Sequence, residues 1–233
     1  MPPKTEAEGA EPVRAPTHRI AVWDLPTRLF HWTLVALIAF SWWSAEEHHA
    51  DWHIWSGLAI LTLLVFRLLW GLFGSSTARF RNFIRGPRAV FGYLRGEWQG
   101  IGHSPLGALS VVALLGFTAI QVGLGLFSSD EDGLVSGPLA HFVSLDLSEE
   151  IADLHDDFFD VLLVLIGIHV AAVLFYLVAK RNNLIRPMIT GRAAIDPPAQ
   201  PMRPGKWWVA LLCLVAAIGF TRWLIAGAPP LGA

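Results

Sequence analysis

The sequence is poor in the residues that soluble proteins carry on their surfaces. Only 15% of its 233 residues are charged, 54% are hydrophobic, and the mean hydropathy is positive. An ordinary soluble domain carries about 25% charged residues. The chain also has a single cysteine, Cys213. One cysteine excludes an internal disulfide, a zinc-thiolate cluster and covalent haem attachment through a C-x-x-C-H motif.

Long apolar stretches indicate a membrane protein. A helix that crosses the hydrocarbon core of a bilayer needs about 20 predominantly apolar residues. The first twenty residues lack such a stretch and are rich in Pro, Glu and Ala, so we expect a disordered cytoplasmic tail and no cleaved signal peptide. The rest of the chain predicts an all-α membrane protein with five apolar stretches, at residues 29–44, 52–73, 106–127, 158–179 and 207–226.

Basic residues are missing from two of the four loops between these stretches. Residues 45–51 contain three acids and residues 128–157 contain nine, and neither loop has Lys or Arg. The other two loops are basic, with five arginines against one acid in residues 74–105 and six basic residues against one acid in residues 180–206. Basic loops tend to stay in the cytoplasm. The pattern predicts a cytoplasmic N-terminus and places the acidic loops on the periplasmic side.

Four of the nine histidines stand on the expected helices, where a polar ring is costly and by default indicates function. They are His31, His53, His155 and His169. His155 and His169 are separated by roughly 40° less than four full turns and by about 21 Å along a helix. Both rings therefore project from nearly one face, at two depths. A lone histidine in a membrane more often bonds a carbonyl of a neighbouring helix, but that reading does not explain four at matching depths.

The predicted topology assigns each histidine a partner. The first stretch enters from the cytoplasm, so His31 is inner, and the second enters from outside, so His53 is outer. On the fourth stretch His155 is outer and His169 inner, which pairs His53 with His155 and His31 with His169. Two opposed imidazoles at each depth are the axial ligands of a six-coordinate b haem. Such haems act as electron carriers, because paired histidines leave no position open for oxygen.

Other residues fit this interpretation less specifically. Gly57, close to His53 in sequence, would let a flat porphyrin approach its helix, although small residues also serve ordinary helix packing. Arg28 and Arg67 lie toward the inner side, where either can pair with haem propionates, and snorkelling to the cytoplasmic interface explains both equally well. The remaining histidines lie in tails or loops, where we expect them to be solvated. His103 is also a candidate to line a quinone pocket.

Several segments resemble the bacterial cytochrome b561 family, which includes the di-haem b subunits of nickel-iron hydrogenases and formate dehydrogenases. They are RLFHW at 28–32, HIWSGLAILTLLVFRLLWG at 53–71, RFRNFIRGPRAVFGYLRG at 79–96, GHSPLG at 102–107, and residues 154–188, which end in KRNNLIRPM. The resemblance implies a four-helix transmembrane bundle with two b haems, whose ligands come from the first, second and fourth helices. Carried over to this sequence, the ligands are His31, His53, His155 and His169.

The resemblance also implies a setting in the bacterial inner membrane. Family members exchange electrons with ubiquinone or menaquinone, often together with a periplasmic redox partner such as a dehydrogenase or a cytochrome c. The acidic loop of residues 128–157 suits a basic partner protein. We divide the chain into a tail, a di-haem domain, and a linker with a fifth transmembrane helix, a departure from the four-helix core. These parts are residues 1–20, 21–191 and 192–233.

Several functions remain open at this point. The chain is either an electron-transfer subunit or a stand-alone quinone-linked oxidoreductase, for instance one that oxidises superoxide. An acidic rim repels a small anion such as superoxide, which favours the protein partner. A metal-transport path is a third possibility, but residues 161–168, between two of the histidines, are apolar. A membrane anchor without a cofactor does not explain the matched histidines. We expect no nucleic-acid partner.

Overall fold

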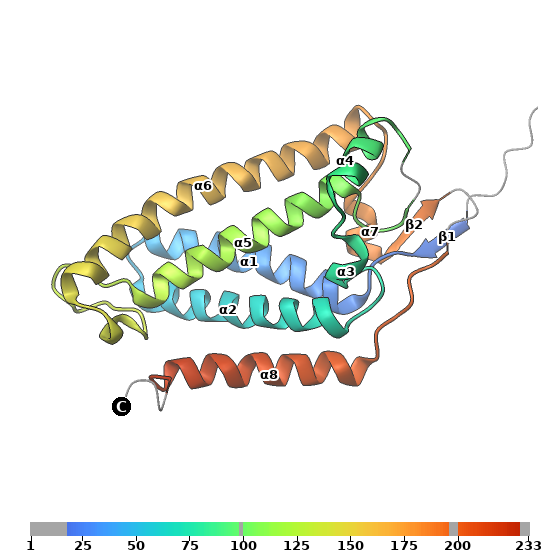
Figure 1. Cartoon of the computed structure of the whole chain (residues 1–233). Coiled ribbons are helices and arrows are strands. Elements are labelled where there is room, and N and C mark those ends of the chain that lie inside the picture. The colour runs from blue at the N-terminus through green and yellow to red at the C-terminus, as the bar shows by residue number, and fades with distance from the viewer. Residues whose placement is uncertain (1–17, 98–99, 196–199, 229–233) are drawn as a thin grey trace, which may run out of the picture.

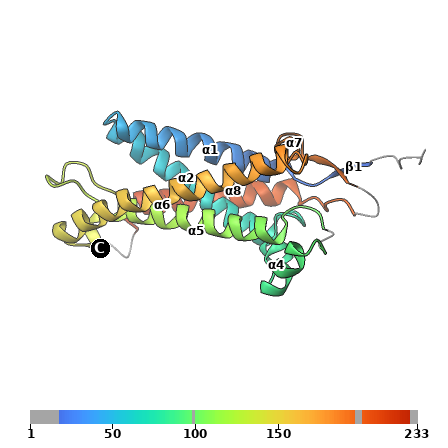
Figure 2. The same cartoon turned by 90° about the horizontal axis from the view of Figure 1, so that it is seen from above.

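Five long helices, roughly aligned along one axis, make up most of the molecule (Figures 1 and 2). The computed structural model describes residues 18–97, 100–195 and 200–228. Each long helix covers one of the five apolar stretches, so the prediction of a mostly helical membrane protein is confirmed. The helices are α1 (Leu25–Glu46), α2 (Ala50–Phe73), α5 (Pro105–Phe127), α6 (Leu145–Val178) and α8 (Trp207–Ile225).

Four of these helices are long and apolar enough to cross a membrane, namely α2, α5, α6 and α8. Helix α1 has 22 residues but is not among them. Its length suffices, and its composition is less apolar because it carries side chains such as His31, Ser41 and Trp42. Helix α1 nevertheless runs beside α2 along the bundle (Figure 1). Of the five membrane spans expected from the sequence, four correspond to helices whose length and composition suit a membrane crossing.

The bundle consists of two helical hairpins and one added helix. Helices α1 and α2 pack against each other, as do α5 and α6. Helix α2 also contacts α5 and α8, and it therefore holds the two hairpins and the C-terminal helix together. In contrast, only Ser148 and Leu162 of α6 are buried. Most of the surface of α6 is thus left for lipid or for a further component of the bundle.

The starts of the long helices are fixed by side-chain caps, which satisfy backbone N–H groups that have no partner within the helix. Asp24 accepts from Thr27 N at 2.7 Å to begin α1, and Ser104 accepts from Gly107 N at 3.1 Å to begin α5. Ser144 does the same for α6, well before the apolar stretch begins. The first part of α6 therefore contains much of the acidic loop that the sequence analysis placed outside the membrane.

Short elements gather at the end of the bundle where α2 ends and α5 begins (Figure 1). Strand β1 (His18–Ala21) pairs antiparallel with β2 (Arg192–Ile195), so part of the expected disordered tail is ordered. The remainder, residues 1–17, lies outside the described residues. The other short elements are α3 (Phe80–Phe83), α4 (Pro87–Leu94) and α7 (Ile185–Thr190), with a 3-10 turn, η1 (Ala140–Phe142), at the opposite end.

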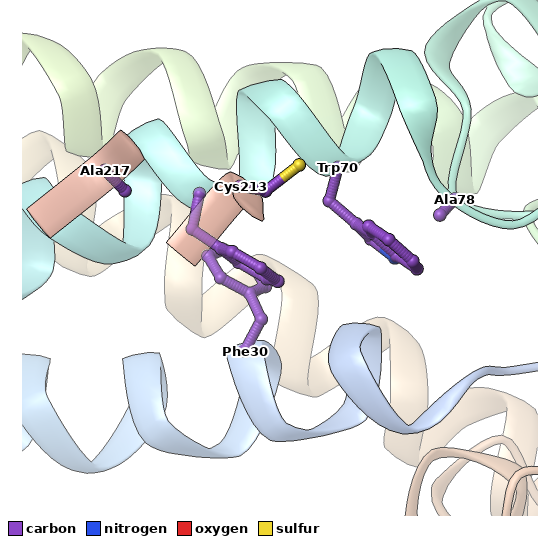
Figure 3. Packing of buried hydrophobic residues seen from close by; sticks show 6 residues of the cluster. Phe30, Trp70, Ala78, Cys213 and Ala217 are labelled. Carbon is purple, nitrogen blue, oxygen red and sulfur yellow. The ribbon is translucent and has the colours of Figure 1, made fainter. Parts of the chain in front are cut away.

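Helix α8 is packed into the molecule and does not stand apart from it. A buried cluster joins Phe30 of α1, Trp70 of α2 and Cys213 and Ala217 of α8 (Figure 3). Farther along, the Oγ1 atoms of Thr62 and Thr221 are 2.8 Å apart, which ties α2 to α8. The indole N–H of Trp70 also donates to Asp24 at 3.0 Å. Asp24 thus caps α1 and fixes the large side chain on which α8 rests.

Candidate functional site

The four candidate histidines lie on two different hairpins. His31 is on α1 and His53 is in the first turn of α2, whereas His155 and His169 are both on α6. Each pair that the sequence predicted therefore combines one residue from the α1–α2 hairpin with one from the α5–α6 hairpin. A metal ion held by either pair would join the two halves of the bundle.

The structure brings the rings of His53 and His155 close together, in an edge-on arrangement. Their ring centroids are 5.9 Å apart and their planes are 89° to each other. Two imidazoles that share a metal ion hold their coordinating nitrogens about 4 Å apart, because each metal–nitrogen bond is about 2 Å long. Since each ring centre lies about 1 Å behind its nitrogen, the centroids of such a pair are about 6 Å apart. The spacing of His53 and His155 matches that requirement.

Hydrogen bonds to backbone carbonyls fix the protonation of both rings. The Nδ1 atom of His53 is 2.9 Å from Ser41 O, and the Nδ1 atom of His155 is 2.9 Å from Gln121 O. A carbonyl oxygen can only accept, so each Nδ1 carries the proton and donates it. In a neutral imidazole this leaves Nε2 unprotonated, which is the form that binds a metal. Both rings are therefore prepared to act as ligands.

The position of His155 is reinforced from α5. The side-chain amide of Gln121 donates to His155 O at 2.8 Å, while His155 Nδ1 donates to Gln121 O, so the two residues lock α5 to α6. Gly125 lies one turn farther along α5, and a Cβ atom there would be 3.0 Å from His155 Cε1. A larger residue at position 125 would therefore press on the ring of His155. Neither Gln121 nor Gly125 was singled out as a contact of His155 from the sequence, because both act across a helix interface.

The inner pair is less tightly held. His31 of α1 and His169 of α6 lie near each other. The Nδ1 atom of His31 is buried and has no hydrogen-bond partner among the described residues. His169 Nδ1 is 3.4 Å from Ser110 Oγ, a long contact. A buried ring nitrogen without a partner is costly unless another group satisfies the ring. His31 thus has a buried ring nitrogen that a further group could satisfy.

Open space adjoins the helices beside these histidines. A Cβ atom added at Gly57 of α2 or Gly123 of α5 would meet nothing within 4 Å, although both glycines are only partly exposed. Gly116 and Gly167 also have open space, but they lie on exposed surfaces where lipid contact explains it. The helix surfaces at Gly57 and Gly123 are therefore open to the approach of another group.

Comparison with known protein families shows which family the chain belongs to. The family model described as prokaryotic cytochrome b561 matches residues 22–191. The chain belongs to this family. No match was found among curated proteins or among solved structures. As a cytochrome b561, the protein is a bacterial membrane b-type cytochrome of electron transport. The match ends before the linker and α8, so the C-terminal helix is an addition to the part that the family model covers.

The residues present fit the b haem that the cytochrome b561 family implies. The fit rests on the spacing of His53 and His155, on their carbonyl-bound Nδ1 atoms and on the unpartnered Nδ1 of His31. The family explains these features together, because a b haem is held by coordination and needs unprotonated ring nitrogens. That these four histidines are the ligands stays a prediction.

The two candidate arginines of this cytochrome b561, Arg28 and Arg67, have partners within the protein. The guanidinium of Arg28 donates to Ile189 O, and its buried Nε has no partner among the described residues. Arg67 is buried, donates to Ala78 O at 3.2 Å, and lies 4.7 Å from the ring centre of Phe80. Arg28 thus contacts α7, and Arg67 contacts the loop that follows α2. A contact with haem propionates remains a prediction for each.

His103 does not have the solvated environment expected for a histidine in a loop. Its ring packs between those of Trp23 and Phe83, and the distance from its centroid to each of their centroids is 4.5 Å. Burial, together with the nearby charge of Arg67, lowers the pKa of His103 to about 3. Its Nδ1 atom has no hydrogen-bond partner among the described residues. The loop position gave no sign of this, because Trp23 and Phe83 are distant in sequence.

Proposed function

We propose that the protein is a di-haem b-type cytochrome that transfers electrons between a periplasmic redox protein and the quinone pool. In this proposal His53 and His155 hold the outer haem, and His31 and His169 hold the inner one. The observation that carries it is the close pair of His53 and His155, whose ring centroids are 5.9 Å apart and whose Nδ1 atoms each donate to a backbone carbonyl. A b haem bound between two imidazoles supplies a one-electron redox centre.

The protein side chains prepare and protect the site. The carbonyls of Ser41 and Gln121 orient the rings and increase the basicity of Nε2, which strengthens metal binding. Because each ring is fixed before a ligand arrives, little conformational entropy is lost on binding. A haem held between two histidines would have no position open for a small molecule, which would suit electron transfer and disfavour reactions at the metal.

We further propose that the N-terminus lies in the cytoplasm of a bacterium, with the protein in the inner membrane. The arginine-rich residues 74–105 and the basic residues 180–206 flank one end of the bundle, and residues 128–157 form the acidic other end. The positive-inside rule places the basic end in the cytoplasm. The pair of His53 and His155 then belongs to the periplasmic half of the membrane.

The acidic end supports a basic protein partner. Exposed carboxylates lie both in the loop before α6 and along the first turns of α6, where Glu150, Asp153 and Asp157 are examples. A rigid helix that carries acids near the outer histidine pair would attract a basic electron protein and repel a small anion such as superoxide. A metal-transport path has less support, because the described residues contain no group of three or more His, Cys, Asp or Glu that could hold a metal ion.

The test is the rate at which the reduced protein, reconstituted in liposomes, is oxidised by a basic c-type cytochrome added outside. We expect the rate to fall steeply with added salt, and to fall about tenfold in a Glu150→Gln, Asp153→Asn, Asp157→Asn variant. Glu97→Gln, at the basic end, is the matched control and should leave the rate unchanged. A water-soluble ubiquinone analogue should oxidise all forms at one rate. A salt-independent reaction, or no reaction with quinone, would refute the proposal.

A further inference from the structure

A groove between the end of α2 and the start of α8 stands apart from the histidine site. It has a volume of about 620 Å³ and is lined by both helices and by residues 204–206 of the linker. Phe73 of α2 and Leu212 of α8 are exposed apolar side chains on its walls. The linker reaches α8 beside the end of α2 (Figure 1). The groove lies mostly on parts of the chain that the family model does not match.

Two cations line this groove, and none of its lining residues is acidic. Arg79 donates from Nε to Gly74 O at 2.8 Å, and its two terminal amino groups have no partner among the described residues. Lys206, just before α8, has its Nζ atom 5.5 Å from the ring centre of Trp208. The groove therefore combines an apolar floor, an interfacial tryptophan and two positive charges that no carboxylate in the lining neutralises.

Two hydrogen bonds and a close contact hold the two walls together. Ser76 N donates to Arg203 O at 3.0 Å, and Arg203 N donates to Ser76 Oγ at 3.0 Å. Trp70 packs so closely on the linker that a Cβ atom at Gly205 would be 2.5 Å from its ring. The loop that carries Arg79 and the linker that carries Lys206 are thus fixed to each other. The charges are positioned before any ligand binds.

We propose that this groove binds an anionic glycerophospholipid, with its phosphate between Arg79 and Lys206 and its acyl chains along Phe73 and Leu212. Basic pockets between transmembrane helices are suited to anionic lipid headgroups, and tryptophan favours the headgroup level of the bilayer. A quinone carries no charge and would leave both cations unsatisfied. The proposal requires only that the protein lies in a membrane, so it stands or falls independently of the haem ligands.

Native mass spectrometry of the full chain in detergent tests the proposal, with phosphatidylglycerol and phosphatidylcholine as competing probes. We expect the wild type to prefer phosphatidylglycerol about thirtyfold, which corresponds to about 2 kcal/mol from two basic residues near an anionic headgroup. An Arg79→Gln, Lys206→Gln variant should bind the two lipids equally. Arg81→Gln, Arg85→Gln is the matched control: it removes two exposed charges of the same loop and should keep the preference.

Ala216→Trp provides a second variant that leaves the charges in place. Ala216 lines the groove and is exposed, so a tryptophan there fills the space for an acyl chain without burying a new group. It should lower retention of phosphatidylglycerol while circular dichroism shows unchanged helix content. Equal affinity for both lipids in the wild type, an undiminished preference in both variants, or a quinone as the species that Ala216→Trp displaces would overturn the proposal.

Discussion

Single hydrogen bonds decide whether the histidines can bind a metal. His53 and His155 each donate a proton to a carbonyl, which is the arrangement that frees Nε2 as a ligand. The sequence indicated all four histidines through their spacing and their place in apolar stretches. It did not indicate Ser41 or Gln121 as acceptors, because a backbone carbonyl is present at every residue. Which carbonyl faces a ring depends on how two helices are rotated against each other.

Gly125→Ala should weaken the outer site. The added methyl group would be 3.0 Å from His155 Cε1, so we expect the ring to shift by a few tenths of an ångström and its bond to Gln121 O to lengthen. Loss of such a supporting bond typically costs about tenfold in metal affinity. We expect the purified variant to contain less than two haems per chain, because the outer site is only partly occupied. Gly219→Ala, on α8 with nothing within 4 Å, is the control, and equal haem contents in the two variants would contradict this role.

His103 should make the protein less stable in acid. Its pKa is about 3 in the folded protein and 6.5 when exposed, so the unfolded chain takes up a proton that the folded chain excludes. The effect is absent above about pH 7, and stability falls as the pH drops from 6.5 toward 3. At pH 5 the loss is about 2 kcal/mol.

Thermal unfolding in detergent at pH 7.5 and pH 5 measures this loss. His103→Phe should reduce the fall in Tm between the two pH values by several degrees. His141→Phe changes an exposed histidine and should leave the fall as in the wild type. If both variants behave like the wild type, His103 is protonated in the folded state.

At the scale of whole elements, the apolar stretches identified the long helices but not their true ends. Helix α6 begins at Leu145 because Ser144 caps it, so α6 extends well outside the apolar stretch on its outer side. Hydropathy alone cannot show such an extension, since its residues are acidic. Strands β1 and β2 were missed for another reason. Arg19 pairs with Ala194, and pairing between residues so far apart leaves no local pattern.

Helix α8 should depend on close packing against α2. Ala217 is fully buried in the cluster around Trp70, so Ala217→Leu would force the helices apart. Overpacking of this kind costs about 1–3 kcal/mol. We expect a lower Tm in detergent than for Ala216→Leu, whose side chain is exposed. The same Tm for both variants would show that α8 is only loosely attached.

For the whole molecule, the charge distribution predicts a single orientation. Cys213 is the only cysteine and is buried, so Cys213→Ser provides a background for labelling. In that background, Asp132→Cys should react with a membrane-impermeant maleimide added to intact spheroplasts. Arg85→Cys should react only after the membrane is broken. Both residues are exposed, so the opposite pattern would mean that the N-terminus faces the periplasm.

The central claim is that two b haems join the α1–α2 hairpin to α6 through four histidines. Haem quantified per chain, together with the reduced minus oxidised spectrum, tests it most directly. We predict two low-spin b haems in the wild type. His155→Ala should lose one low-spin signal and His169→Ala the other, and the double variant should show no low-spin signal. Fewer than two haems in a well-folded wild type, or either single variant with both low-spin signals intact, would contradict the account.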